Sequence, residues 1–281
     1  MRRLDLARHG VLVTGATGGI GRAIAEHLLH RGCRVALMSR PSERLDGLLE
    51  ELDSDNAIAA PAEISDRVQV TSAIDAAAER FGGLDAVVAG AGVVIPATIG
   101  EQTEEECRSV INTNFFGTLW TLQAAMPHLN AAGGHFLALA SIAGIMPAPL
   151  SGVYPATKAA VGQLVSQVRI ETRNLPMSAG VAYLGMVDTE MSTSISDDER
   201  LGRALDSTPS FLTGSLDPEA TARRLVRGLQ RREATIITPW WLTPSAAPEL
   251  ALKRATETAI RFSALARELP TRRPRTPHPN E

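Results

Sequence analysis

Cysteine, tyrosine and lysine are all scarce in this chain of 281 residues, with two of each. Two cysteines, Cys33 and Cys107, are too few for a disulfide framework. Nearly all of the 28 basic residues are therefore arginine, and 31 acidic residues give a net charge of −3. Because this charge leaves no excess of basic residues, the composition argues against nucleic acid as a partner.

Long hydrophobic runs are also missing. The longest nearly apolar stretch, Phe136–Leu150, is interrupted by polar residues, glycine and proline and is too short to cross a membrane. The first ten residues carry several charges and are not typical of a secretory signal. With 44% hydrophobic and 21% charged residues, the composition is that of a folded globular protein, and we expect a cytoplasmic location.

Short apolar segments alternate with longer segments of helical periodicity, a pattern typical of a parallel sheet with crossover helices. The predicted strands are Val11–Thr14, Arg34–Ser39, Ala57–Ala60, Ala86–Ala89, His135–Ala140, Ser178–Leu184 and Thr235–Ile237. The predicted helices are Gly19–Arg31, Glu43–Leu52, Asp66–Phe81, Thr103–Leu129, Gly152–Arg173 and Asp217–Arg231. The pattern predicts a single α/β domain over residues 1–247, with a Rossmann-type, doubly wound and mostly parallel sheet of seven strands.

Three segments depart from this alternation. Residues 185–215 are polar and long for a loop, which favours a substrate lid within the domain. Residues 248–268 have the pattern of an amphipathic helix, for which contact with a membrane surface is an alternative to packing on the protein. Residues 269–281 are rich in proline and arginine and are expected to be disordered.

A glycine-rich segment follows the first predicted strand and opens the next helix, with the spacing Gly-x-x-x-Gly-x-Gly from Gly15 to Gly21. In such a turn the backbone amides and the positive end of the helix bind a pyrophosphate. Glycine allows the sharp turn and the close approach of the ligand. The segment therefore predicts a dinucleotide site, with contacts from Gly15, Thr17, Gly19, Ile20 and Gly21.

The end of the second predicted strand bears on which dinucleotide binds. An NAD site of this architecture usually has a carboxylate there, which accepts a hydrogen bond from the ribose. This chain instead has Ser39 and Arg40, with no acidic residue before Glu43. A guanidinium can donate two hydrogen bonds to a 2′-phosphate. Ser39 and Arg40 therefore favour NADP(H) over NAD(H).

A serine, a tyrosine and a lysine form the second motif. Ser141 closes the fifth predicted strand, and Tyr154 and Lys158 lie four residues apart at the start of a helix, on one face. A nearby ammonium lowers the pKa of a phenol toward neutrality, where proton transfer is efficient. A serine hydroxyl can donate to a substrate oxygen that gains negative charge. The set predicts acid–base chemistry on a carbonyl or an alcohol.

Together these motifs resemble the short-chain dehydrogenase/reductase family over about residues 9–240. The resemblance implies an NAD(P)-dependent carbonyl reductase or alcohol dehydrogenase. It implies that Tyr154 is the acid or base, that Ser141 orients the carbonyl, and that Lys158 lowers the pKa of the tyrosine and contacts the nicotinamide ribose. It also implies that Asn114 holds a proton-relay water, although Asn112 lies close by in the sequence.

The resemblance extends to further cofactor contacts. Thr189 matches the threonine that contacts the nicotinamide carboxamide, and Glu63 and Ile64 match the residues near adenine. The remaining expected cofactor residues are Ala89, Gly90, Ala91 and Val187. Two departures weaken the match: Ala89–Gly92 stands where the family has Asn-Asn-Ala-Gly, and Leu184-Gly185 stands where it has Pro-Gly.

The expected substrate walls are mostly apolar and include no arginine or lysine to pair with an anion, which favours a lipophilic ketone or secondary alcohol. They are Val93, Val94, Ile95, Ala143, Ile145, Met146, Leu150, Val153, Met186, Met191, Phe211 and Leu212. The family resemblance also suggests a homodimer or homotetramer. The alternatives are a dinucleotide-binding sensor or scaffold without turnover, and an NAD(H)-dependent alcohol dehydrogenase of the same fold. No set of metal ligands converges in the sequence, so no metal is expected.

Overall fold

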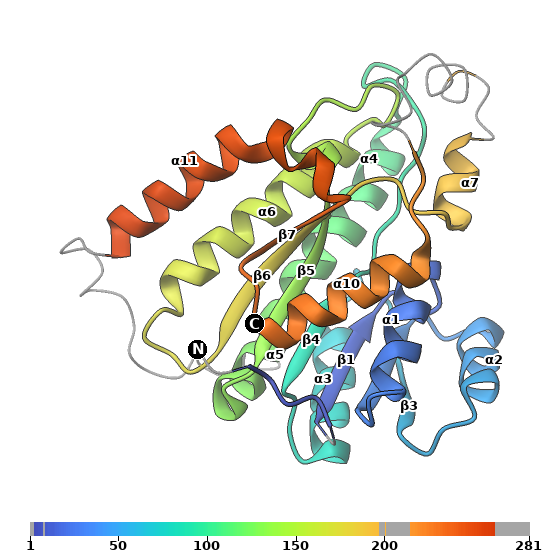
Figure 1. The fold of residues 1–281 in the computed structure, drawn as a ribbon. Coiled ribbons are helices and arrows are strands. Elements are labelled where there is room, and N and C mark those ends of the chain that lie inside the picture. The colour runs from blue at the N-terminus through green and yellow to red at the C-terminus, as the bar shows by residue number, and fades with distance from the viewer. Residues whose placement is uncertain (1–2, 8, 197–199, 201–213, 262–281) are drawn as a thin grey trace.

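The computed structural model describes residues 3–7, 9–196, 200 and 214–261. These residues form one seven-stranded sheet with helices on both faces (Figure 1). The strands are β1 (Gly10–Thr14), β2 (Arg34–Ser39), β3 (Ala57–Pro61), β4 (Ala86–Ala89), β5 (His135–Ser141), β6 (Ser178–Leu184) and β7 (Thr235–Thr238).

The strand order across the sheet is β3-β2-β1-β4-β5-β6-β7, and all neighbouring strands are parallel. This is the predicted Rossmann-type, doubly wound sheet in one domain. The chain changes direction across the sheet between β1 and β4, and ligands of such sheets bind outside the carboxyl ends of the strands at that point. The register aligns the last residues of β1 and β4, Thr14 and Ala89.

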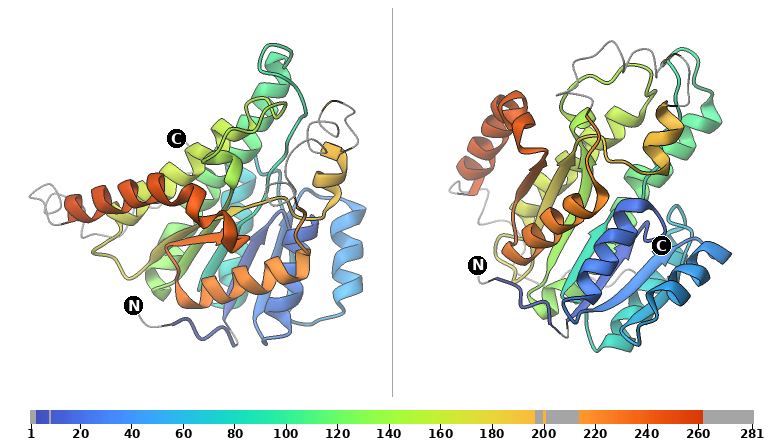
Figure 2. Two further views of the ribbon diagram at one scale, coloured as in Figure 1. Left: turned by 45° about the horizontal axis from the view of Figure 1, so that its top comes forward. Right: turned by 45° about the vertical axis from the view of Figure 1, so that its right-hand side comes forward.

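Helices cover both faces of the sheet (Figure 2). They are α1 (Gly19–Leu29), α2 (Glu43–Leu52), α3 (Arg67–Phe81), α4 (Glu104–Ile111), α5 (Gly117–Ala132), α6 (Tyr154–Glu171), α7 (Glu190–Ser196), α10 (Pro218–Arg231) and α11 (Thr243–Arg261). Helices α1, α2 and α10 pack on one face, and α3, α5 and α6 pack on the other. Helix α11 lies against α6, so it adds a partial outer layer on that side (Figure 1).

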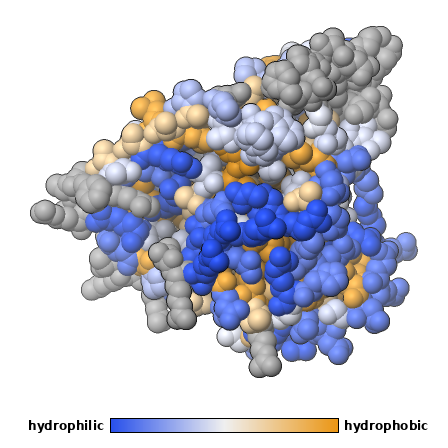
Figure 3. Space-filling model, in the orientation of Figure 1, coloured by the Kyte–Doolittle hydropathy of each residue, from blue (hydrophilic) through white to orange (hydrophobic). Residues whose placement is uncertain are grey.

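Alternation along the strands supplies both hydrophobic cores. In β1, Val11 and Val13 face the core under α1 and α10, whereas Leu12 faces the core under α3 and α5. Successive side chains of a strand point to opposite faces, and a sheet covered on both sides therefore needs apolar residues at every position. The outer side of α10 is hydrophilic, with Arg223 and Arg227 exposed (Figure 3).

The helix predicted over Thr103–Leu129 is not continuous. A π-helical turn, η1 (Asn112–Phe116), separates α4 from α5. A π turn holds an additional residue, which shifts the following positions around the helix axis. Within η1, Asn114 is fully buried and Asn112 is exposed. The π turn therefore decides which of the two asparagines faces the protein interior.

The expected lid and the C-terminal segments are only partly described. Residues 185–215 contain α7, but Phe211, Leu212 and the rest of 197–199 and 201–213 lie outside the described residues. Helix α11 begins at Thr243 rather than at residue 248. It is joined to α6 by a largely buried ion pair, in which the Arg169 Nη2 lies 2.9 Å from a Glu257 carboxylate oxygen. The tail 269–281 lies outside the described residues.

Candidate active site

The loop between β1 and α1 closes tightly against the end of β4. Gly15 has a φ of +69°, and a Cβ on it would lie 2.8 Å from the Cα of Ala91. A Cβ on Gly21 would overlap the carbonyl oxygen of Gly15. Glycine is therefore required at both positions. No side chain caps the amides at the start of α1, and these amides border an open cleft, so they are suited to bind a phosphate.

This cleft extends from the glycine loop along the carboxyl ends of β2 and β3. Most of the expected cofactor residues line it: Gly15, Thr17, Gly19, Ile20, Gly21, Ser39, Arg40, Glu63, Ile64, Gly90, Ala91 and Thr189. Four expected residues do not. Ala89 is buried at the end of β4, and Val187 lines the adjoining pocket described below, as do Tyr154 and Lys158. We call this region the polar cleft.

Sequence reasoning missed Arg44, which lines the polar cleft with Arg40. Arg44 belongs to the first turn of α2, and its Nη2 lies 2.8 and 2.9 Å from the two carboxylate oxygens of Glu190 at the start of α7. Both side chains are exposed. The available signal was a second arginine, four residues after Arg40. Nearby, the Thr17 and Ser39 hydroxyl oxygens lie 2.9 Å apart, which joins the glycine loop to the end of β2.

The end of β4 is held by Thr14. Its buried hydroxyl accepts hydrogen bonds from the backbone amides of Gly90 (3.0 Å) and Ala91 (3.1 Å). A Cβ on Gly90 would lie 3.0 Å from the carbonyl oxygen of Thr14, which is tighter than ordinary contact. Thr14 therefore supports the loop in which the segment Ala89–Gly92 departs from the family motif.

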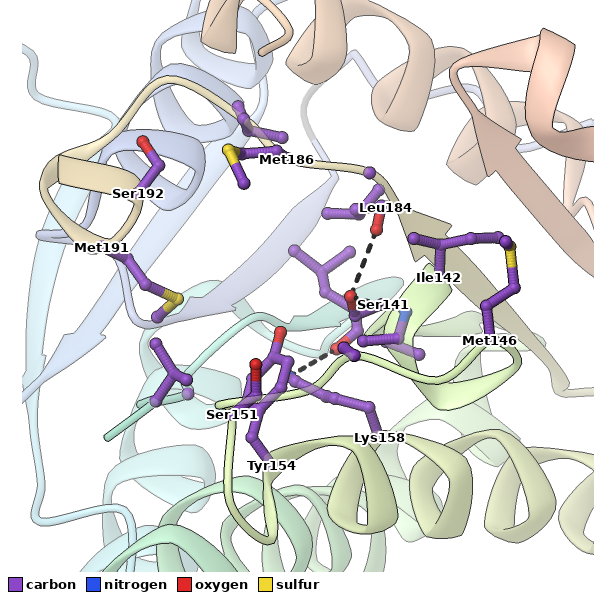
Figure 4. Close-up of a pocket in the computed structure, with 18 of the residues that line it drawn as sticks. Ser141, Ile142, Met146, Ser151, Tyr154, Lys158, Leu184, Met186, Met191 and Ser192 are labelled. Carbon is purple, nitrogen blue, oxygen red and sulfur yellow. Dashed lines mark hydrogen bonds between the residues drawn. The ribbon is translucent and has the colours of Figure 1, made fainter. Parts of the chain in front are cut away.

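Ser141, Tyr154 and Lys158 come together at the carboxyl edge of the sheet. Ser141 ends β5, and its hydroxyl donates to the carbonyl of Leu184 (3.3 Å) and accepts from the amide of Ala143 (3.2 Å). Tyr154 begins α6 and is hydrogen-bonded to Ser141. The Lys158 Nζ lies 5.6 Å from the centroid of the Tyr154 ring. Figure 4 shows Ser141 and Tyr154 turned into one cavity, with Met186 and Met191 across it.

Burial dominates the electrostatics of this cluster. It raises the pKa of the Tyr154 phenol, and the hydrogen bond with Ser141 acts in the opposite direction. It also lowers the pKa of Lys158 to about 8. The expected lowering of the phenol pKa by Lys158 stays a prediction, since burial sets the net direction here. The Lys158 Nζ donates to the Leu139 carbonyl (3.1 Å), so the ammonium is held by the backbone of β5.

Asn114 joins the β4 loop to α6. Its side-chain amide exchanges two hydrogen bonds with the backbone of Val93, at 2.8 and 2.9 Å, and donates to the hydroxyl of Thr157 at 3.0 Å. Opposite it, a Cβ on Gly92 would lie 3.3 Å from the Asn114 Oδ1 and 3.2 Å from the Lys158 Nζ. Asn112 instead lines the polar cleft. The structure thus brings Asn114 close to Lys158.

A second cavity of about 350 Å³ adjoins the polar cleft and is mostly apolar. Among the described residues that line it, Lys158 alone carries a charge. Five of the expected wall residues line it: Val94, Ala143, Met146, Met186 and Met191. Four others, Ile95, Ile145, Leu150 and Val153, are not part of its lining, and Val93 lines the polar cleft instead.

Sequence reasoning missed part of this apolar pocket. Ile142, Pro147, Ala148 and Pro149 from the loop after β5, Leu184 at the end of β6 and Ser192 of α7 also line it. So does Leu242, in the short helical turn η3 (Trp240–Leu242) after β7. Leu242 is buried, whereas Trp240 and Trp241 are exposed and contact each other edge to face. Only the folded chain brings Leu242 to the pocket.

Two further findings concern the described part of the chain. It holds no group of three or more His, Cys, Asp or Glu side chains placed to bind a metal ion. None of its helices combines the length and the apolar character needed to cross a membrane.

Known proteins resemble this chain in sequence and in structure. The family model described as short chain dehydrogenase matches residues 9–200. An uncharacterised oxidoreductase of Staphylococcus aureus is 35% identical over 190 residues, which cover 67% of this chain and 82% of the relative. A Staphylococcus epidermidis oxidoreductase, also uncharacterised, is 32% identical over the same shares of the two chains.

Two solved structures share the fold. A short chain dehydrogenase from Burkholderia cenocepacia, in complex with NADP, matches with a TM-score of 0.73 and 25% identity, covering 83% of this chain and 97% of that chain. An alcohol dehydrogenase from the archaeon Thermococcus sibiricus, complexed with 5-hydroxy-NADP, matches with a TM-score of 0.69 and 30% identity, covering 82% and 94%. With the glycine loop and the Ser141, Tyr154 and Lys158 cluster, these matches establish that the chain belongs to the short-chain dehydrogenase/reductase family of NAD(P)-dependent oxidoreductases.

Proposed function

We propose that the protein interconverts a carbonyl group and a secondary alcohol on an apolar substrate, with NADP(H) as its cofactor. One observation carries this proposal. Ser141 and Tyr154 line the apolar pocket, and Gly90, Gly92 and Thr189 line both this pocket and the polar cleft. A carbonyl group in the pocket would therefore lie between two hydroxyl groups and the cofactor site.

The residues of the polar cleft fit NADP(H). The amides at the start of α1 suit the pyrophosphate, and the arginines Arg40 and Arg44 suit a 2′-phosphate. Glu63 and Ile64 lie at the other side of the cleft, where we place the adenine, and Thr189 and Val187 lie at the nicotinamide end. NADP bound to the Burkholderia protein and 5-hydroxy-NADP bound to the Thermococcus protein support this choice. The bound cofactor would supply or accept the hydride.

The protein would supply the proton. Ser141 would donate a hydrogen bond to the substrate oxygen, which stabilises the negative charge that develops there. Tyr154 would donate its proton to the same oxygen. Because burial raises the pKa of Tyr154, the phenol is protonated at neutral pH, the form needed for carbonyl reduction. Lys158 would stabilise the resulting phenolate, and the proton relay would pass between Lys158 and Asn114, beside Gly92.

The lining of the pocket supports an apolar substrate. A carboxylate or phosphate in this cavity would lose hydration without an arginine to pair with it, because Lys158 is the one charged residue in the described lining. The three methionines Met146, Met186 and Met191 have flexible side chains that adapt to the shape of an apolar ligand. We therefore propose a lipophilic ketone or secondary alcohol.

The test is NADPH oxidation measured against a panel of ketones and aldehydes that varies in size and charge. We expect turnover with apolar ketones, and Michaelis constants at least about tenfold lower for NADPH than for NADH because of the two arginines. A preference for short anionic substrates would reject the substrate class, and a preference for NADH would reject the cofactor. Cofactor binding without turnover on any carbonyl would favour the sensor alternative.

Location and assembly are part of the same proposal. We propose a cytoplasmic homodimer or homotetramer. If α6 contributes to its interface, the partner must pack beside α11, which already contacts α6 through the Arg169–Glu257 pair.

A further inference from the structure

Gln102 occupies a junction between the two loops that flank the apolar pocket. Its Oε1 accepts a hydrogen bond from the backbone amide of Val153 (2.9 Å), and its Nε2 donates to the carbonyl of Ile95 (3.4 Å). Val153 directly precedes Tyr154, and Ile95 belongs to the loop after β4. One side-chain amide therefore joins the β4–α4 loop to the residue before the proposed proton donor.

The backbone of Gln102 is itself anchored. Thr103 caps α4 with a full capping box, in which its hydroxyl accepts from the Glu106 amide and the Glu106 carboxylate accepts from the Thr103 amide. Such a box stabilises the start of a helix. Gln102 precedes this cap, so its side chain extends from a fixed point on α4 toward the start of α6.

The start of α6 needs this outside partner. In a capping box the third helical residue accepts a hydrogen bond from the N-cap amide, but here that residue is Ala156, whose side chain has no acceptor for the Val153 amide. An amide left without an acceptor at such a partly buried position is destabilising. Gln102 provides the missing acceptor from another segment of the chain.

The neighbouring backbone is shaped around Gln102. Gly152 has a φ of +52°, and a Cβ on it would overlap the Gln102 amide group. Two backbone hydrogen bonds lie alongside, from Gly152 to the carbonyl of Ala97 (2.9 Å) and from Ala97 to the carbonyl of Leu150 (3.1 Å). The side-chain amide of Gln102 thus packs directly against Gly152, where backbone hydrogen bonds join the two loops.

We infer that Gln102 is a positioning residue, which sets the place of Tyr154 relative to Ser141 by holding the amide of Val153. The inference rests on the proposed role of Tyr154 as the proton donor. Gln102 and Val153 line neither the polar cleft nor the apolar pocket, so Gln102 acts through the backbone. A small displacement of a reacting group costs much of its rate, whereas cofactor binding at the glycine loop is unaffected.

Two substitutions separate the hydrogen bond from the volume of the side chain. Gln102→Met keeps the length and removes the acceptor, whereas Gln102→Glu keeps the acceptor for Val153 and loses only the weaker donation to Ile95. We expect Gln102→Met to lower kcat at least about tenfold, with the Kd for NADPH unchanged and faster hydrogen exchange at the Val153 amide. We expect Gln102→Glu to keep kcat within about threefold of the wild type and to keep the amide protected.

Each readout has a separate meaning. Unchanged NADPH affinity shows that a variant is folded. A wild-type kcat for Gln102→Met, or equal losses of kcat for both variants, would overturn the inference. If the wild type itself turns over no carbonyl, the proposed function fails, and with it the role of Gln102 in positioning a proton donor. In that case exchange at the Val153 amide still tells whether Gln102 holds the loop.

Discussion

At the scale of the residue, the two tyrosines of the chain show how surroundings decide chemistry. Tyr183 is buried and Tyr154 is partly buried, and burial raises the pKa of both phenols, that of Tyr183 to about 12. Tyr154 nevertheless lines the apolar pocket and contacts Ser141. Tyr183 instead points from β6 into the core, against Gly162. Only Tyr154 can reach a substrate.

This contrast provides a matched pair of variants. Tyr154→Phe removes the proposed proton donor and leaves the ring, so we expect turnover to fall by at least about 100-fold while NADPH still binds. Tyr183→Phe removes the other phenol of the chain and should keep its rate within about threefold, because this ring has only a packing role. Steady-state kinetics and cofactor titration measure both. Equal losses in the two variants would contradict the assignment of Tyr154.

At the scale of the element, α2 and α7 meet at the mouth of the polar cleft. Arg44 of α2 binds Glu190 of α7 through both carboxylate oxygens. The pair is exposed, so it adds little to stability. Its importance is electrostatic: a bound 2′-phosphate would compete with Glu190 for the Arg44 guanidinium, and the Glu190 carboxylate would repel the phosphate.

Removing the carboxylate should therefore strengthen cofactor binding. We expect Glu190→Gln to lower the Kd for NADPH about two- to fivefold and to change the Kd for NADH less, because NADH lacks the 2′-phosphate. Fluorescence titration at low ionic strength measures both. Glu79→Gln, which removes an exposed carboxylate of α3 outside the cleft, serves as the control. A weaker affinity for NADPH in Glu190→Gln would show that the pair supports the site instead.

At the scale of the whole molecule, the two ends of the sheet carry different groups of polar residues. The carboxyl end holds the candidate active site, and the amino end holds a polar cluster around the buried His135. There the His135 Nδ1 bonds the Ser178 hydroxyl (2.8 Å), and the Arg232 guanidinium bonds the same hydroxyl and the carbonyls of Gly133 and Gly134. Burial, with Arg232 and Arg169 nearby, lowers the pKa of His135 to about 3.

This cluster predicts how stability depends on pH. The pKa of His135 is lower in the folded chain than in the unfolded chain, so between about pH 6.5 and pH 3 the unfolded chain binds the additional proton. The contribution of the neutral His135 to the free energy of unfolding is therefore complete above about pH 6.5 and decreases as the pH falls. We expect His135 alone to remove about 2 kcal/mol of unfolding free energy by pH 5.

Urea unfolding at several pH values tests this dependence. His135→Asn keeps an amide for Ser178 but has no group to protonate, so we expect a less stable protein at neutral pH with a shallower loss of stability toward pH 5. His30→Asn, at an exposed histidine of the same chain, is the control. An unchanged slope in His135→Asn would contradict the role of His135.

Local patterns in the sequence determined much of this protein. The alternation of apolar and helical segments specified a doubly wound sheet, since a sheet covered on both faces requires apolar strands. The glycine loop, Ser141, Tyr154 and Lys158 were found for the same reason: each depends on residues close together in the chain, where spacing dictates geometry.

The tertiary structure alone decided the rest. Leu242 reaches the apolar pocket, Gln102 reaches Val153, and Arg44 reaches Glu190, across separations that no periodicity records. The π turn that buries Asn114 was also hidden, because an inserted residue leaves the apolar pattern nearly unchanged. These contacts arise where loops from different strands converge at one edge of the sheet, so their partners are set by packing and not by sequence spacing.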